Sequence, residues 1–129
     1  MATSSDPVVI VSAARTPLGK FMGDLSPFSA HKLGAHVISA AVERAKLAPE
    51  RIDEVFMGCV LPAGQGQAPA RQAARGAKLP DATGATTINK VCGSGMKATM
   101  LAHDIINAGS AEIVVSGGME SMKIGRAHV

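Results

Sequence analysis

Aromatic residues are almost missing from this 129-residue sequence, which has three Phe and neither Trp nor Tyr. Proteins that bind single-stranded nucleic acid stack its bases on aromatic side chains, so the sequence lacks that kind of surface. Positive charge forms no run either, because the 13 Lys and Arg residues are scattered among 10 acidic ones. We therefore predict no nucleic-acid partner.

Cysteine and long apolar runs are scarce as well. Cys59 and Cys92 are the only two cysteines, which are too few for a disulfide framework and lack the paired spacing of a zinc site. No apolar run reaches the roughly 18 residues of a membrane span. The start, MATSSDP, lacks the charged and apolar regions of a signal peptide. These absences predict a cytoplasmic protein with reduced thiols, no metal and no membrane contact.

Hydrophobic residues, by contrast, are abundant at 47%, against 18% charged residues, which predicts a single folded domain. Residues 8–13, VVIVSA, form a continuous run of the kind that fills a strand buried on both faces. Leu33 and Val37 follow at helical spacing after Ser29, a residue type that favours helix N-termini. Pro49 should end this helix.

Further along, strands and helices are predicted to alternate. The predicted strands are residues 55–61, 85–89 and 112–118, and the predicted helices start at Pro69 and at residue 93, ending near Gly76 and at Gly109. The order βαβαβαβ predicts an α/β fold, in which helices cover both faces of a mainly parallel sheet.

Cys92 lies between the strand predicted at 85–89 and the helix that follows it. The carboxyl ends of parallel strands are where α/β proteins place their sites. A helix N-terminus offers free N–H groups and partial positive charge, which favour a thiolate and can hold an oxyanion. Gly93 and Gly95 would leave room for an acyl group, and Ser94 is placed to satisfy the first helical amides. Cys92 is therefore a candidate nucleophile for thioesters.

Other interpretations of these residues stay open. A free cysteine is more often a small core side chain than a nucleophile, above all for Cys59 inside its apolar strand. Residues 64–67, GQGQ, lack the ending of a phosphate loop and are interpreted as a turn. The histidines have no metal-ligand spacing. Met96 and Met100, four residues apart on a predicted helix, are expected to pack into the core.

Four segments occur in the order and spacing of one enzyme family: VVIVSAARTPLGKFMGDLS, GQAPARQAA, NKVCGSGMKA and VVSGGMESM. With them the chain resembles the thiolases, in particular the acetyl-CoA acetyltransferases, over residues 7–122. The resemblance implies a thiolase-like N-terminal domain and matches Cys92 to the nucleophile that acyl-CoA acylates. The implied reaction condenses two acetyl-CoA to acetoacetyl-CoA and coenzyme A, or runs in reverse, without a cofactor beyond the coenzyme A thioester substrates.

Several parts of the thiolase pattern are missing from this sequence. The histidine of Gly-His-Pro, the second cysteine of Cys-x-Gly, the Asn-Glu-Ala-Phe segment and the loop domain all come from later thiolase sequence. The chain alone is therefore expected to be inactive, and the resemblance implies a parent that is a homodimer or homotetramer. A non-catalytic thiolase-like binding or assembly module is the alternative, and mitochondrial or peroxisomal location stays open.

The last seven residues, KIGRAHV, do not continue the pattern before them. Back-translated as AAG ATC GGA AGA GCA CAC GTC, they resemble a common sequencing adapter. We therefore expect residues 1–122 to form part of a thiolase N-terminal domain and residues 123–129 to be a non-native tail. A genuine C-terminus is the alternative.

Overall fold

Parallel pairing of three strands organises residues 8–122, the part of the chain that the computed structural model describes. The tail predicted at residues 123–129 lies outside the described residues. The elements are α1 (Ala30–Arg44), a 3-10 turn η1 (Pro49–Arg51), β1 (Glu54–Gly58), α2 (Pro69–Gly76), β2 (Gly84–Ile88), α3 (Ser94–Asn107) and β3 (Val114–Gly118). Within this range no helix is both long and apolar enough to span a bilayer.

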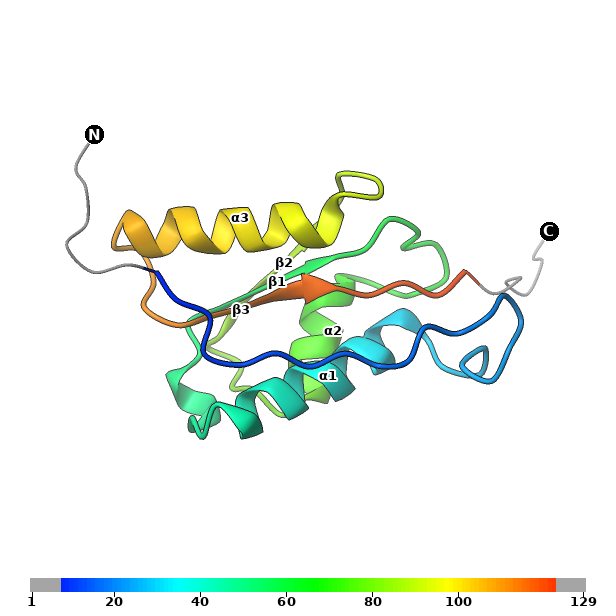
Figure 1. The fold of residues 1–129 in the computed structure, drawn as a ribbon, viewed down its shortest axis with the longest axis horizontal. Helices are drawn as coiled ribbons and strands as arrows, with labels where there is room; N and C mark the ends of the chain where they lie inside the picture. The colour runs from blue at the N-terminus through cyan, green and yellow to red at the C-terminus, as the bar shows by residue number, and fades with distance from the viewer. Residues whose placement is uncertain (1–7, 123–129) are drawn as a thin grey trace.

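The strand order is β2-β1-β3, and both neighbours run parallel to β1. Glu54, at the start of β1, lies opposite Gly84 and Val114, so all three strands end at the same edge. Figure 1 shows α3 along one face of this sheet and α1 with α2 along the other. The prediction of an α/β fold with helices on both faces of a parallel sheet is confirmed.

Each face of the sheet has its own apolar core. On one face α1 and α2 pack against β1 through fully buried side chains that include Ile38, Val55 and Met57. On the other face Phe56 packs against Ala98 and Ala102 of α3. Alternation along β1 sends successive side chains to opposite faces, so one strand serves both cores. Burying a side chain as large as Phe56 contributes about 2 kcal/mol to stability.

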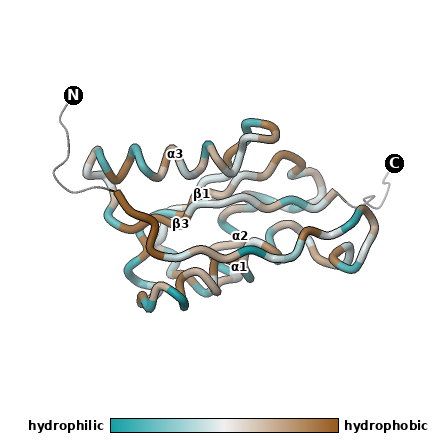
Figure 2. Tube along the Cα trace, in the orientation of Figure 1, coloured by the Kyte–Doolittle hydropathy of each residue, from teal (hydrophilic) through white to brown (hydrophobic). Residues whose placement is uncertain are grey.

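The strand predicted at residues 8–13 is wrong. This segment is extended but belongs to no strand, and Val9, Ile10 and Val11 are 65%, 83% and 68% exposed. In Figure 2 it is the darkest hydrophobic stretch of the tube. The physical reason is that no backbone hydrogen bond joins it to another described residue, although Arg44 Nη1 donates to Ala13 O at 2.8 Å. Apolar β-branched sequence predicts a strand only where a partner strand exists.

Helix and strand limits also differ from the sequence prediction in places. α1 ends at Arg44, where Lys46 adopts a left-handed φ of 56°, and Pro49 begins the separate turn η1. β1 ends at Gly58 rather than at Leu61, because the Val60 and Leu61 amides donate to a side chain instead of a neighbouring strand. α2 begins at Pro69, and Gly109 follows α3 at a φ of 78°, both as predicted.

Met96 and Met100 do not pack into the core as expected. They are 73% and 53% exposed, because α3 turns Ala98 and Ala102 toward the sheet and the methionine face away from it. A spacing of four residues places two side chains on one helix face, but it does not say which face the sheet covers.

Candidate functional site

Gly58 brings the start of α3 directly onto the carboxyl edge of the sheet. A Cβ on Gly58, the last residue of β1, would lie 2.6 Å from the Ser94 carbonyl carbon and 2.7 Å from Gly95 N. On the neighbouring strand, a Cβ on Gly118 would be 3.4 Å from Gly95 Cα, which is ordinary van der Waals contact. Gly58 therefore sets how closely the helix approaches, and α3 begins where β1 and β3 end.

The turn from β2 into α3 carries Cys92 and is held by local hydrogen bonds. Val91, just before the cysteine, has a φ of 47°, a left-handed conformation that costs a β-branched residue roughly 1–2 kcal/mol. Val91 N donates to Asn89 Oδ1 at 3.0 Å, and Val91 O accepts from Ser94 Oγ at 2.6 Å. These bonds offset the strain and fix the backbone on both sides of the thiol.

Cys92 is exposed at this turn, as the sequence predicted for an accessible thiol. The Gly95 and Met96 amides, in the first turn of α3, have no hydrogen-bond partner among residues 8–122. Such free N–H groups at a helix N-terminus can stabilise negative charge on a thiolate or an oxyanion. The position expected for Cys92, at the carboxyl edge of a parallel sheet and the start of a helix, is confirmed.

The neighbours of Cys92 have different roles from those predicted. Ser94 does not cap α3, because its Oγ accepts from Lys90 N at 2.8 Å and donates to Val91 O. Gly95 packs against β3 instead of opening a path to the thiol. Gly93 fits the prediction better, since a Cβ there would meet only Lys90 O, at 3.5 Å.

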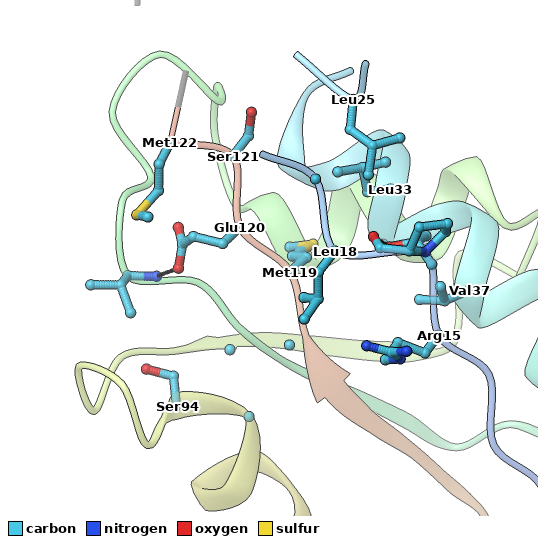
Figure 3. Close-up of a pocket in the computed structure, with 18 of the residues that line it drawn as sticks. Arg15, Leu18, Leu25, Leu33, Val37, Ser94, Met119, Glu120, Ser121 and Met122 are labelled. Atoms are coloured by element: carbon cyan, nitrogen blue, oxygen red, sulfur yellow. Dashed lines mark hydrogen bonds between the residues drawn. The ribbon is translucent and has the colours of Figure 1, made fainter. Parts of the chain in front are cut away.

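A cleft of about 540 Å³ lies at this edge of the sheet, and Cys92 is among the residues that line it. Its walls come from the 14–26 segment, from α1, from the ends of β1 and β3 and from the turn before α3. Figure 3 shows Arg15, Leu18 and Met119 on one part of the wall and Ser94 on another. The cleft combines apolar side chains with a few polar groups, which suits an acyl thioester.

Sequence reasoning missed Glu120, which follows β3 and lines the same cleft. Its Oε2 accepts from Val60 N at 2.9 Å, the bond drawn as a dashed line to Glu120 in Figure 3. Its Oε1 accepts from Leu61 N at 3.0 Å. The Cys59 thiol donates to Oε1 at 3.8 Å. An acidic residue just past a predicted strand end was the available signal, because that is the edge where the cysteine turn also lies.

Cys59 is chemically unlike Cys92. It is 1% exposed, and burial raises the pKa of its thiol, with a further rise from the negative charge of Glu120. Both effects keep the thiol protonated and unreactive. The interpretation of Cys59 as a core side chain is confirmed, although it lies one residue past the end of β1.

No group of three or more His, Cys, Asp and Glu side chains within residues 8–122 is arranged to hold a metal ion. His31 is half-buried in the first turn of α1, where burial and then the nearby Lys32 lower the pKa of its imidazole. His36 and His103 are exposed on α1 and α3. None of these three histidines lines the cleft with Cys92.

Iodoacetamide is expected to alkylate Cys92 about 100-fold faster than Cys59 at neutral pH, because only Cys92 is exposed and the Cys59 pKa is raised. Peptide mass spectrometry over a time course measures both rates in one sample. In urea, where both thiols are exposed, the two rates should converge. Equal rates under native conditions would contradict the burial of Cys59.

The chain is similar to known thiolases over most of its length. The family model described as "Thiolase, N-terminal domain" matches residues 8–126. An acetyl-CoA acetyltransferase of Cupriavidus necator is 64% identical over 115 residues, which are 89% of this chain and 29% of that protein. The human mitochondrial acetyl-CoA acetyltransferase is 55% identical over 115 residues, 89% of this chain and 27% of that protein. The cytosolic acetyl-CoA acetyltransferase ERG10 of Gibberella zeae is 57% identical over 116 residues, 90% of this chain and 29% of that protein.

A solved structure agrees with the fold. The crystal structure of Acat5 thiolase from Ascaris suum in complex with coenzyme A matches with a TM-score of 0.83 and 41% identity, over 84% of this chain and 28% of that one. The chain thus spans between 27% and 29% of the length of the relatives named here.

Proposed function

The chain belongs to the thiolase family, as a thiolase N-terminal domain, and on this basis we propose that the whole protein is an acetyl-CoA C-acetyltransferase with Cys92 as its nucleophile. The observation that carries the proposal is the exposed Cys92 thiol at the turn between β2 and α3, on the wall of the cleft. The relatives that span this turn are named acetyl-CoA acetyltransferases, and the structural neighbour is a thiolase in complex with coenzyme A.

In the first half-reaction the Cys92 sulfur attacks the carbonyl carbon of acetyl-CoA, a carbon–sulfur bond forms, and coenzyme A leaves as its thiol. Exchanging one thioester for another costs little free energy and keeps the acetyl group activated. In the second, the methyl group of another acetyl-CoA loses a proton and its carbon attacks the Cys92 thioester. A carbon–carbon bond forms, acetoacetyl-CoA leaves, and the Cys92 sulfur regains a proton. Free N–H groups at the start of α3 are placed to stabilise charge near the thioester.

The remaining machinery is proposed to come from the rest of the protein. By resemblance to thiolases, the Gly-His-Pro histidine activates Cys92 and the Cys-x-Gly cysteine deprotonates the second acetyl-CoA. The 129-residue chain contains neither motif, so we expect it to be inactive by itself. Residues 1–122 then form part of the N-terminal domain, with residues 123–129 as a non-native tail.

Partners and location follow the same reasoning. We propose that the whole protein uses coenzyme A thioesters as substrates with no further cofactor, and that it forms a homodimer or homotetramer. The relatives include a protein named cytosolic and others named mitochondrial. We propose a cytoplasmic location, as for the relative named cytosolic, with a mitochondrial location as the alternative.

Incubating the full-length protein with acetyl-CoA tests the proposal. Acetoacetyl-CoA should accumulate, and trapping with acid should leave an acetyl group on the peptide that contains Cys92. A non-catalytic thiolase-like module would yield neither product nor acetylated peptide. Turnover with the acetyl group on another residue would assign the nucleophile elsewhere.

A further inference from the structure

The Glu120 carboxylate, just after β3, binds the chain that follows β1, where the two strands no longer pair. Beyond Gly58 and Gly118 the pairing of β1 with β3 continues for a single backbone bond, from Met119 N to Gly58 O at 2.9 Å. Cys59 N still donates to Ile88 O of β2 at 3.0 Å, but the two donors after it, Val60 N and Leu61 N, bind the Glu120 side chain at 2.9 and 3.0 Å. One carboxylate therefore takes the place of a partner strand.

The hydrogen bonds from Val60 N and Leu61 N are charge-assisted, and they use both oxygens of the Glu120 carboxylate. Hydrogen bonds between a backbone N–H and an ionised carboxylate are stronger than those between neutral groups. The Cys59 thiol also donates to Oε1, at 3.8 Å. With both oxygens occupied, Glu120 is poorly placed to act as a base, although it lies in the cleft.

The loop that Glu120 holds forms part of the cleft. Val60 lines the cleft together with Cys92, and the same loop continues to Gln65, whose Oε1 accepts from Ala30 N at 2.9 Å at the start of α1. The residue after Glu120 is also tied, since Ser121 Oγ donates to Phe28 O at 3.1 Å. The end of β3 is thus fastened to the loop after β1 and to the chain before α1.

We propose that Glu120 is a positioning residue of the active site: by fixing the Val60–Leu61 amides it sets the wall of the cleft that faces the acyl group on Cys92. The proposal rests on the proposed function of Cys92. Val60 and Cys92 line the same cleft, so displacement of this wall is expected to disturb the approach of the acyl group to Cys92 more than the binding of the large coenzyme A portion. A shift of about 1 Å in such a wall lowers turnover by up to about 100-fold.

The test uses the full-length protein with Glu120→Ala and Glu120→Gln, and Glu112→Ala as a matched control with an exposed glutamate at the opposite end of β3. Glu120→Ala should lower kcat at least tenfold while KM changes less than threefold. Glu120→Gln keeps the shape and one acceptor oxygen, so its kcat should lie between that of Glu120→Ala and that of the unchanged protein. Glu112→Ala should match the unchanged protein. If Glu120→Ala leaves kcat within twofold, or raises KM alone, the positioning role is overturned.

Alkylation of Cys59 reports on the same loop without any catalytic assay. Both Glu120→Ala and Glu120→Gln remove the negative charge that raises the Cys59 pKa, but only Glu120→Ala removes both acceptor oxygens. Release of the loop should therefore make the buried Cys59 react with iodoacetamide at least tenfold faster in Glu120→Ala than in Glu120→Gln. Equal Cys59 rates in the two variants would overturn the proposal even in a protein without turnover. If the full-length protein without substitutions showed no turnover of acetyl-CoA, the proposed function would be contradicted instead. The Cys59 alkylation rates would then still decide whether Glu120 holds the loop.

Discussion

Replacing Cys92 by alanine is expected to lower the turnover of acetyl-CoA by the full-length protein about 10⁴-fold or more, because the acyl group then has no sulfur to bond to. The exposed thiol at the turn before α3 is the only cysteine among residues 8–122 that a substrate can reach, since Cys59 is buried. Stability should change little, because an exposed side chain leaves no cavity. Steady-state kinetics, a trapped acyl-enzyme assay and thermal unfolding measure the three effects.

Cys59→Ser is the matched control for this prediction. A hydroxyl at that position can still donate to Glu120, so the loop after β1 keeps its anchor and turnover should stay near that of the unchanged protein. If Cys92→Ala retained turnover within tenfold, or if Cys59→Ser lost as much as Cys92→Ala, the assignment of the nucleophile to Cys92 would fail.

Replacing Gly58 by alanine should also have a large effect, although Gly58 carries no chemistry. The new Cβ would lie 2.6 Å from the Ser94 carbonyl carbon and 2.7 Å from Gly95 N, and backbone atoms of this kind cannot rotate away. α3 must therefore move off the sheet, with a loss of about 3 kcal/mol in the free energy of unfolding. Because Cys92 lies at the start of that helix, turnover should fall by about 100-fold in the fraction that still folds.

Gly95→Ala tests the same contact from the helix side. Its Cβ would be 3.5 Å from Gly118 N, which is ordinary van der Waals contact, and alanine favours helix over glycine by up to about 1 kcal/mol. This variant should unfold at or above the temperature of the unchanged protein and keep most of its turnover. Equal losses of stability in Gly58→Ala and Gly95→Ala, measured by thermal unfolding, would show that the close approach at Gly58 is not what seats α3.

Much of the fold could be predicted because it follows from local pattern. Helical spacing of apolar residues located α1, Pro69 marked the start of α2, and Gly109 marked the end of α3. The same local logic failed at residues 8–13, where the apolar run was correct but the hydrogen-bond partner of a strand is a property of other parts of the chain. It failed again at Met96 and Met100, because spacing does not say which face of a helix meets the sheet.

By itself, the sequence determined the α/β alternation, the resemblance to thiolases and the place of Cys92 at the corner between a strand and a helix, since each depends on residues close together in the chain. Only the tertiary structure decided that Gly58 seats the helix that follows Cys92 and that Glu120 takes the place of a strand for Val60 and Leu61. Such contacts join residues far apart in sequence, up to 60 positions for Val60 and Glu120. Parallel pairing alone brings them together, because it gathers the carboxyl ends of all three strands at one edge.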